Sequence, residues 1–521
     1  MLEFISNMIY IVCDMSENYK AKVGRMIQDQ RLARQMTQSQ LAKSIGTSQS
    51  AINRIEKGNQ NISLEMLARI SEVLENDIIS LNRDGKTNFR INGGKKLSGN
   101  IDVKTSKNAA VALLCACLLN KGKTTLRNVA KIEEVNRLIE VLVSVGVNVQ
   151  WLENSNDLEI KPPKVLKLNQ IDNNAAKRTR SIIMFLGPLL YQYHSFSLPF
   201  AGGCNLGTRT IEPHILGLQP FGMNVITSNN KYKVESNPKS VKESIVLTER
   251  GNTVTENILM AAALQPSEVT IKNASNDYMV IDLCHFLVKL GAKIDGIGST
   301  TLKITGKNSF NKNFEFYPGE DPIEAMSLIT AGIITNSQIT VKRIPIDYLE
   351  VELAVLRSMG LKYTLSDTYL SNNEFTNLAD ISLLESSLVA PKDKLTTFPS
   401  AVNMDNLPFL GLIATAAKGR TLLHDWPYEN RAIYFTYLSP MNATIELVDP
   451  HRVYISGPTK WRAADLVAPP ALRPSVVVML AMLAAPGESI LRDVYNIQRG
   501  YEGLPERLNS LGADIQTINS I

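Results

Sequence analysis

Apolar and polar positions follow two different patterns along the chain. Residues 20–83 read as short amphipathic helices separated by polar turns. From residue 91 onward, helical runs that are apolar on every side alternate with polar turns and β-rich stretches. The stretch "NRDGKTNFR", residues 82–90, breaks both patterns with Asp-Gly and polar residues. The sequence thus predicts an N-terminal extension (1–19), an all-α module (20–83), a linker (84–90) and a large α/β part (91–521).

The front module centres on two short helices. Thr37 is placed to cap a helix that runs through Ser44, and Gly46 supplies the tight turn after it. Ser48 opens a second helix that ends near Gly58. The apolar positions predict the buried faces, formed by Leu41, Ala42, Ile45, Ala51, Ile52 and Ile55.

The polar side chains of this module are of the kinds that read DNA. The outer face of the second helix carries amides, hydroxyls and a guanidinium, which bond base edges and phosphates in a major groove. Over about 60 residues, the module at 20–83 resembles the Cro/C1-type helix-turn-helix domain. That resemblance implies DNA contact within residues 37–58, by Gln38, Ser48, Gln49, Ser50, Asn53 and Arg54. Ten Lys/Arg against six Asp/Glu, a net charge of +4 over residues 20–83, suit contact with phosphates. A helical protein-interaction module is the alternative, and a homodimer stays open because domains of this kind usually bind DNA as dimers.

The larger part repeats one theme six times. Each copy has a first helix that is apolar all round, a polar turn, a β-rich run and often a second helix ending in Gly. Buried helices with sheets outside them predict an inverted α/β barrel in two lobes of three units. We place lobe one at about 108–321 and lobe two at about 91–107 plus 322–521. Two lobes imply a cleft for a ligand.

Composition and targeting signals narrow the setting. The 521 residues are 44% hydrophobic and 20% charged, and the net charge of +5 is too mild to demand nucleic acid. No apolar run reaches the roughly 18 residues of a membrane span, and the first residues lack a basic start. Five cysteines without metal-type spacing suit a reduced cytoplasm. We expect a cytoplasmic protein that does not enter a membrane.

One cysteine stands in an unusual context. In "LPFAGGCNLGTRTIEPH", Cys204 follows two glycines and precedes Arg209 by five residues. Such a segment suits a mobile loop near positive charge, where a thiol has a lowered pKa. Cys115 and Cys117, by contrast, fall in an apolar helix and behave as small hydrophobic residues.

From about Phe89 to the C-terminus, the chain resembles the UDP-N-acetylglucosamine enolpyruvyl transferases. The stretches that carry the resemblance are "GGKKLSGNIDVKTSKNAAVALL", "TRSIIMFLGPLL", "LPFAGGCNLGTRTIEPHILGL", "YENR" and "IQRGYEGLPERLNSLGADI". These enzymes share a two-lobed fold with 5-enolpyruvylshikimate-3-phosphate synthase. The resemblance implies transfer of the enolpyruvyl group of phosphoenolpyruvate to the 3-hydroxyl of UDP-N-acetylglucosamine, with release of phosphate. It implies no metal or cofactor.

The resemblance also assigns residues. Phosphoenolpyruvate needs fixed cations, and Lys107, Arg180, Arg209 and Arg499 match the residues that hold it. Arg431 matches a further arginine of the cleft, and Asn108 matches a contact to the sugar nucleotide. Asp405 matches the base, and Cys204 matches the cysteine that protonates phosphoenolpyruvate or bonds to it. The alternative for Asp405 is a helix N-cap, and His214 is expected to be structural.

Several motifs depart from the family. Pro322 replaces an arginine, Ala471 replaces an acidic residue, and Met279 replaces one of an acidic pair that keeps Asp277. "GNTVT" at 251–255 replaces a nucleotide-contacting "SVGAT", and Asp465 is too far from Ala471 to substitute easily. The sequence therefore leaves two other functions open. One is an enolpyruvyl transferase with another nucleotide acceptor, and the other is a ligand-sensing transcription regulator without activity.

Overall fold

The computed structural model describes residues 36–60, 87–200, 210–228, 231–397 and 402–519, and single positions between 24 and 73. The chain divides into two units, which are described separately. The first comprises residues 1–90, 491–495 and 516–521, and the second comprises residues 91–490 and 496–515.

The first unit contains the predicted helix pair, α3 (Gln38–Ile45) and α4 (Gln49–Glu56). The Thr37 side chain caps α3 in a reciprocal capping box with Gln40, and Gly46 ends α3 at φ 73°. Ser48 caps α4 through the Ala51 N–H. All six predicted core positions are buried, and most of them pack in one cluster with Ile27 and Ile70. The local prediction is confirmed.

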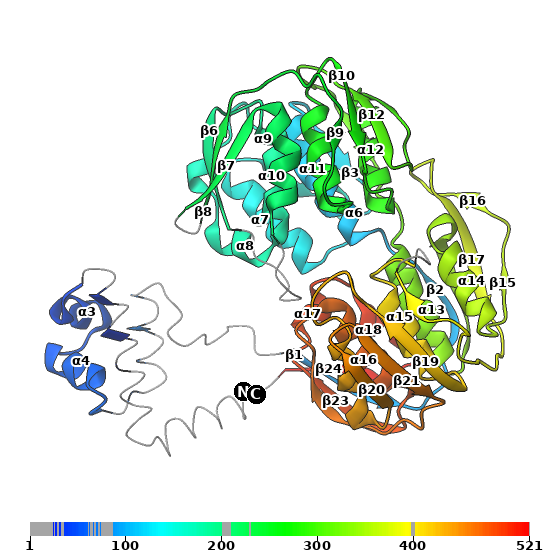
Figure 1. Ribbon diagram of the computed structural model, residues 1–521. Coiled ribbons are helices and arrows are strands. Elements are labelled where there is room, and N and C mark those ends of the chain that lie inside the picture. The colour runs from blue at the N-terminus through cyan, green and yellow to red at the C-terminus, as the bar shows by residue number, and fades with distance from the viewer. Residues whose placement is uncertain are drawn as a thin grey trace. The chain divides into compact units, whose positions relative to one another are not determined.

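The sheets of the second unit follow the predicted division into three per lobe (Figure 1). Lobe one has the sheet orders β13-β3-β5-β4, β11-β12-β10-β9 and β6-β8-β7. Its strands are β3 (Thr124–Leu126), β4 (Asn148–Trp151), β5 (Leu158–Lys161), β6 (Ser195–Pro199), β7 (Met223–Ser228), β8 (Lys231–Ser236), β9 (Ile245–Val246), β10 (Glu268–Lys272), β11 (Lys293–Asp295), β12 (Thr301–Thr305) and β13 (Phe314–Phe316).

Lobe two has the orders β22-β23-β1-β24, β15-β17-β14-β2 with β16 on β17, and β18-β19-β21-β20. Its strands are β1 (Thr87–Gly93), β2 (Ser98–Asp102), β14 (Gln338–Pro345), β15 (Tyr363–Leu365), β16 (Tyr369–Leu370), β17 (Asn377–Leu383), β18 (Leu395–Thr396), β19 (Gly419–His424), β20 (Thr444–Asp449), β21 (Arg452–Gly457), β22 (Asp465–Val467), β23 (Gly487–Arg492) and β24 (Ile515–Asn519). In the described residues each sheet is open, so the barrel-like character comes from sheets arranged around helices.

The helices lie inside the sheets, as the apolar runs predict. The residues of α13, α15 and α16 are almost all buried, whereas strands such as β8 and β12 alternate buried and exposed positions. The helices are α6 (Lys107–Ala116), α7 (Glu133–Ser144), α8 (Asn173–Arg178), α9 (Leu186–Leu189), α10 (Glu212–Leu218), α11 (Asn252–Ala262), α12 (Tyr278–Leu290), α13 (Pro322–Ile334), α14 (Glu350–Ser358), α15 (Leu407–Ala414), α16 (Leu472–Ala484), α17 (Tyr495–Gln498) and α18 (Leu504–Asn509). The predicted inverted α/β class is confirmed.

Each of the six units ends its second helix in a left-handed residue. A left-handed residue stops a helix because it turns the chain back over the last turn. Five are the predicted glycines and the fifth unit uses an asparagine: Gly146, Gly222, Gly291, Gly360, Asn442 and Gly512.

Two runs that the sequence predicts as α-helices form 3-10 helices over most of their length. The run "SIIMFLGPLL" forms the 3-10 helix η3 (Arg180–Phe185) before the short α9, and "IYFTYLSPM" forms η6 (Ile433–Met441). In the first, Gly187 donates its N–H to Asn257 Oδ1 at 2.7 Å, and a Cβ at Gly187 would lie 2.3 Å from the Asn257 carbonyl. In the second, Pro440 has no N–H to donate. The remaining 3-10 turns are η1 (Cys117–Leu119), η2 (Leu168–Gln170), η4 (Gln219–Phe221) and η5 (Ile346–Tyr348).

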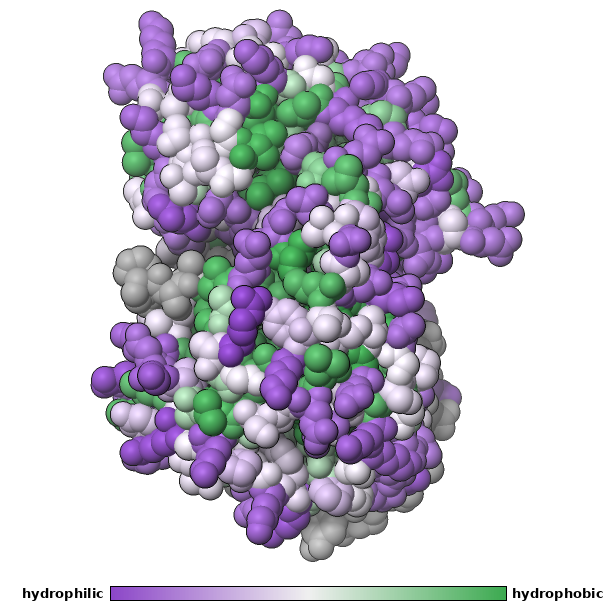
Figure 2. All heavy atoms as spheres, turned by 90° about the vertical axis from the view of Figure 1, so that its right-hand side faces the viewer, coloured by the Kyte–Doolittle hydropathy of each residue, from purple (hydrophilic) through white to green (hydrophobic). Residues whose placement is uncertain are grey.

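The face shown in Figure 2 is covered mainly by polar side chains, with apolar ones in small separate groups. None of the helices in the described part of the chain has both the length and the apolar character needed to cross a bilayer. Cys115 and Cys117 are buried, and burial raises the pKa of Cys117 to about 12. Their predicted role as small hydrophobic residues is confirmed.

Candidate active site

One cavity of about 670 Å³ in the second unit is lined from both lobes. Lobe one contributes the N-terminal ends of α6 and α11, and lobe two contributes the turn before α15 and the N-terminal end of α16. Residues far apart in the sequence therefore meet here. The predicted site residues that line it are Lys107, Asn108, Asp405, Arg431 and Arg499.

Lys107 and Asn108 are the first two residues of α6. Ser106 caps this helix through the Ala109 N–H, so the polar pair stands at the open end of an otherwise apolar helix. Lys107 Nζ lies 3.9 Å from Glu134 Oε2, and Asn108 Nδ2 donates to the Tyr278 hydroxyl at 3.2 Å. Burial lowers the pKa of Lys107, although the charge of Glu134 opposes that shift.

Glu134, on α7, organises the cations on this side of the cavity. Its carboxylate accepts from Arg499 Nε at 2.5 Å and from Thr179 Oγ1 at 2.8 Å. Burial alone would raise the pKa of Glu134, but the charges of Lys107 and Arg499 outweigh it and lower that pKa. Glu134 is thus an ionised carboxylate shared by two cations, and sequence reasoning did not single it out.

Asp405 lies in the turn before α15. Its N–H donates to Asn403 Oδ1 at 2.9 Å, and its Oδ2 lies 3.7 Å from an Nη of Arg473. Asn406, not Asp405, is the N-cap position of α15, and no side chain caps that helix end. The interpretation of Asp405 as an N-cap is therefore wrong, and Asp405 is one of the residues that line the cavity.

Arg473 is a buried cavity cation that sequence reasoning missed. Its side chain is 12% exposed, and its buried Nε has no hydrogen-bond partner among the described residues. The signal was present, because "ALRPS" keeps the arginine of the family's "DLRAS" although its acidic residue is lost.

Arg431 lies deeper than the other cations. Its side chain is 5% exposed, its Nε lies 2.8 Å from Asp425 Oδ1, and an Nη donates to the Met404 carbonyl at 2.9 Å. Because Met404 precedes Asp405, this contact fixes the turn that carries the candidate base.

Three predicted residues cannot be placed in this geometry. Cys204 and Arg209 lie outside the described residues. Arg180 begins η3, but its side chain is likewise outside the description. Their roles stay predictions.

Two of the departures from the family, Pro322 and Ala471, lie outside the cavity lining at the N-terminal ends of helices. Pro322 is the first residue of α13, where proline is tolerated, and Asp321 caps that helix through the Ile323 and Glu324 N–H groups. Ala471 is a buried N-cap position with no side-chain hydrogen bond. Asp465 belongs to β22, outside the cavity lining, and His214 is buried between Asn257 and Thr253 as a structural residue.

The predicted DNA-contacting side chains form a connected polar surface in the first unit. Gln49 Nε2 donates to Gln38 Oε1 at 2.8 Å, and Gln38 Nε2 donates to Glu56 Oε2 at 2.8 Å. Glu56 is held by a buried ion pair with Arg31 at 2.6 Å. Ser48, Ser50 and Arg54 are exposed, and Asn53 is partly exposed.

Comparison with known proteins finds one matching family for the large α/β part of the chain and another for the N-terminal helices. Residues 91–508 match the family EPSP synthase (3-phosphoshikimate 1-carboxyvinyltransferase), and residues 27–80 match the helix-turn-helix family. The UDP-N-acetylglucosamine 1-carboxyvinyltransferase of Treponema denticola is 34% identical over 82% of this chain and 98% of its own. That of Bradyrhizobium diazoefficiens is 32% identical over 82% and 98%.

Solved structures share the fold. The enolpyruvyl transferase NikO from Streptomyces tendae matches with a TM-score of 0.72 at 21% identity, over 84% of this chain and 100% of its own. EPSP synthase from Acinetobacter baumannii matches with a TM-score of 0.65 at 16% identity, over 83% and 100%.

The chain therefore belongs to the EPSP synthase family of enolpyruvyl transferases and carries an N-terminal helix-turn-helix domain. Within that family, its relatives at 30% identity or more place it with the UDP-N-acetylglucosamine 1-carboxyvinyltransferases.

Proposed function

We propose that the chain transfers the enolpyruvyl group of phosphoenolpyruvate to the 3-hydroxyl of UDP-N-acetylglucosamine. The observation that carries this proposal is the convergence of Lys107, Arg473 and Arg499 on one cavity with the carboxylate of Asp405. A phosphate and a carboxylate on one small molecule need several fixed cations, and forked guanidiniums suit both groups.

The chemistry follows from these groups. The acceptor hydroxyl loses its proton to Asp405 while its oxygen bonds to C2 of phosphoenolpyruvate, and C3 gains a proton from an acid. Loss of phosphate from C2 and of a proton from C3 then restores the double bond. By resemblance, Cys204 supplies the proton to C3.

The acceptor is the part of the proposal with a rival. The identity to UDP-N-acetylglucosamine enzymes supports that nucleotide. Another nucleotide is favoured by the changed wall, where Asn252 Nδ2 bonds Asp277 Oδ2 at 2.8 Å and Met279 stands in place of an acidic residue.

Phosphate release from phosphoenolpyruvate by purified protein tests this function. Release should require UDP-N-acetylglucosamine and fall sharply in Cys204→Ala. Release with a different nucleotide instead would establish the rival acceptor. Nucleotide binding without any release, and no alkylation of Cys204 by fosfomycin, would leave the ligand-sensing regulator as the function.

We further propose that the helix-turn-helix domain binds DNA with α4 in the major groove. The exposed amides and guanidinium of α4 support this, as does the net charge of +4 over residues 20–83. Selection from random duplexes should enrich a sequence whose affinity falls with salt. Asn53→Ala should weaken binding by about 1–3 kcal/mol.

Ser44→Ala, an exposed change on α3, is the matched control. The absence of any enriched sequence would favour the protein-interaction module. Sedimentation of the full chain with and without the selected duplex would report whether it binds as a dimer.

A further inference from the structure

The chain passes between the lobes at two adjacent segments, residues 103–106 and 319–321. Thr105 and Glu320 form an antiparallel bridge, Ser106 N–H donates to the Gly319 carbonyl at 2.7 Å, and Asp321 N–H donates to the Lys104 carbonyl at 2.9 Å. The first segment leads directly into α6, which begins with Lys107. The second ends at Asp321, the N-cap of α13. The paired crossovers therefore set the position of cavity residues.

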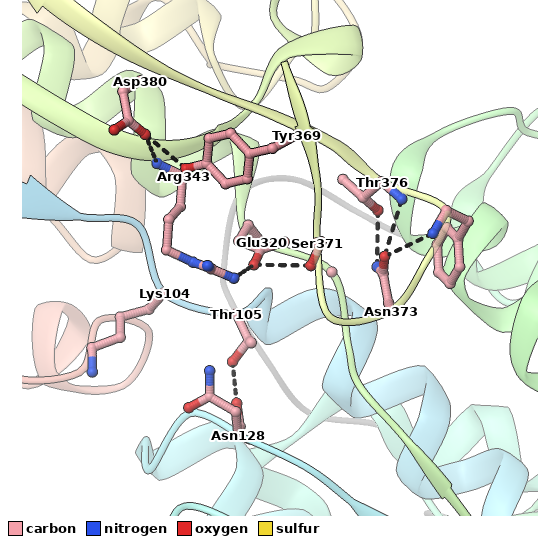
Figure 3. A network of polar contacts seen from close by, with 12 residues as sticks. Lys104, Thr105, Asn128, Glu320, Arg343, Tyr369, Ser371, Asn373, Thr376 and Asp380 are labelled. Carbon is pink, nitrogen blue, oxygen red and sulfur yellow. Dashed lines mark hydrogen bonds and ion pairs between the residues drawn. The ribbon is translucent and has the colours of Figure 1, made fainter. Parts of the chain in front are cut away.

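Glu320 fixes the crossovers to lobe two. Its side chain is buried and forms an ion pair with Arg343 of β14 (Figure 3). Ser371 Oγ donates to Glu320 Oε1 at 3.0 Å. Arg343 has φ 60°, and its N–H donates to Asp380 Oδ1 at 3.0 Å. The buried carboxylate of Glu320 depends on its two donors, Arg343 and Ser371, so loss of either donor disturbs the crossover directly.

Ser371 begins a turn, residues 371–376, that we call the strap. The Ser371 N–H donates to the Thr376 carbonyl at 2.9 Å, and Asn373 Oδ1 accepts from the Phe375 and Thr376 N–H groups at 3.2 and 3.0 Å. Its own hydrogen bonds thus define its shape. Figure 3 shows the strap beside Glu320, with Ser371 directed at the carboxylate.

The strap also reaches lobe one. The Phe375 ring stacks on His285 of α12 with ring centroids 3.8 Å apart and an interplanar angle of 11°, and it lies 6.2 Å from the Phe316 ring. Asp282, one turn before His285 on α12, accepts from the Gly319 N–H at 2.8 Å. A Cβ at Gly319 would lie 3.1 Å from Asp282 Oδ1 and 3.4 Å from Asn373 Nδ2. Helix α12 and the strap therefore close on the same crossover residue.

We propose that the strap is a non-covalent link between the lobes that holds the two crossovers together and so positions Lys107 for phosphoenolpyruvate. Ser371 and Phe375 are positioning residues, because they act through Glu320 and α12 rather than on the substrate. The kinetic consequence rests on the proposed transferase function, but the mechanical one does not. Displacement by about 1 Å suffices to slow a positioned reaction.

Hydrogen–deuterium exchange of the ligand-free full chain tests the mechanical link. In Ser371→Ala and Phe375→Ala, peptides that contain the Ser106 and Asp321 amides should exchange about fivefold faster, as expected for loss of about 1 kcal/mol of local hydrogen bonding. Leu370→Ser is the matched control, because that side chain of the same hairpin is 61% exposed. Ser371→Thr should restore the slow exchange. If Phe375→Ala does not fold, Ser371→Ala alone carries the test.

Steady-state kinetics of the same variants test the positioning. The KM for phosphoenolpyruvate should rise about fivefold in Ser371→Ala, whereas a merely smaller folded fraction would lower kcat alone. Unchanged exchange at both crossovers would overturn the strap, whatever the activity. Faster exchange with an unchanged KM would overturn its positioning role. A wild type without turnover would count against the proposed function and leave the exchange result decisive for the strap.

Discussion

The two ends of the cavity bury carboxyl groups with opposite consequences. At the end of the cavity near α6 and α7, Glu134 lies between Lys107 and Arg499, and the charges of those two residues lower the pKa of Glu134 although burial would raise it. Near α11, burial raises the pKa of Glu256 to about 8, and the charges of Asp277 and Asp282 add to the shift. Burial also raises the pKa of Asp277 to about 6, against hydrogen bonds from Asn252 and other groups.

The difference shows that charge partners, not burial, decide what each end can bind. Two cations, Lys107 and Arg499, share the single carboxylate of Glu134, so a net positive charge is left there to attract a substrate anion. A protonated carboxyl group and amides instead offer neutral hydrogen bonds, which suit the uncharged parts of a nucleotide sugar. Under the proposed function, we therefore expect the first end to bind an anion and the second to bind hydroxyl and amide groups.

Removal of Arg473 should have the largest effect. Arg473→Ala deletes a cation and leaves Asp405 without the guanidinium 3.7 Å away. We expect kcat/KM for phosphoenolpyruvate to fall about a hundredfold to a thousandfold, because removal of one preorganised donor to a developing charge typically costs about 2.7–4 kcal/mol. Phosphate release measures this.

Arg420→Ala is the matched control, since Arg420 pairs with Glu446 on the exposed surface of lobe two and stands outside the cavity. A kcat/KM for Arg473→Ala within twofold of the control would show that the cation end does not hold the substrate.

Neutralising Glu134 should have a smaller effect that depends on pH. In Glu134→Gln, Lys107 loses the charge that opposes its pKa depression. The Lys107 pKa then falls further, so the ammonium loses its proton at lower pH. We expect the alkaline limb of the pH profile of kcat/KM for phosphoenolpyruvate to move down by roughly one pH unit.

The variant Glu133→Gln, one residue away on α7, should leave that limb unchanged, because Glu133 pairs with Arg137. An alkaline limb in Glu134→Gln that coincides with the wild type would mean that Lys107 does not control it.

The fold was predictable because its signals are local and repeated. Apolar all-round helices identified the buried layer, and glycines such as Gly146 and Gly222 marked the ends of the second helices. The 3-10 winding of η3 was not predictable from local sequence, because the contacts around it come from far along the chain: Asn257 of α11 donates to the Ile183 carbonyl within η3 and accepts from the Gly187 N–H after it. Local patterns carry no information about such approaches.

The site was predictable only where a motif carried it. Lys107, Asp405 and Arg499 come together as the resemblance implies. Glu134 was missed because its role depends on Lys107 and Arg499, which come from other segments of the chain. In the sequence alone, an acidic residue in the first turn of an amphipathic helix looks like an ordinary surface residue. Assignment of such a residue requires the three-dimensional neighbours that determine its charge.

The end of the cavity near α11 is here called the acceptor end. Asn252→Ala at this end should weaken the binding of the nucleotide and leave the binding of phosphoenolpyruvate unchanged. Asn252 donates to Asp277 and accepts from Ser275 Oγ at 2.6 Å, so its loss loosens the wall near α11. We expect the KM for UDP-N-acetylglucosamine to rise about fivefold, as for one hydrogen bond of about 1 kcal/mol, with the KM for phosphoenolpyruvate unchanged. Equal increases in both KM values would contradict the division of the cavity into two ends.

The smallest effect on turnover is expected from Glu256→Gln, whose consequence is for stability. The folded-state pKa of about 8 lies above the usual value of 4.5, so between those pH values the folded chain binds more protons than the unfolded chain. The contribution of Glu256 to the free energy of unfolding is therefore fully present below about pH 4.5 and falls as pH rises toward 8. Glu256→Gln keeps the shape and removes the titration. The free energy of unfolding, measured by thermal unfolding at several pH values, should then depend less on pH in the variant. Its slope between pH 5 and 7 should change by about 1 kcal/mol per pH unit.

Glu249→Gln is the matched control, because Glu249 lines the same cavity but is exposed. Equal pH dependence of unfolding in Glu256→Gln and the wild type would mean that Glu256 is ionised in the folded chain. A charged Glu256 near Asp277 would require a bound cation or water to stabilise it, and the acceptor end would then resemble the anion-binding end in its charge balance. A flattened dependence would instead sharpen the contrast, since a neutral carboxyl group can donate a hydrogen bond to the acceptor that an ionised one cannot.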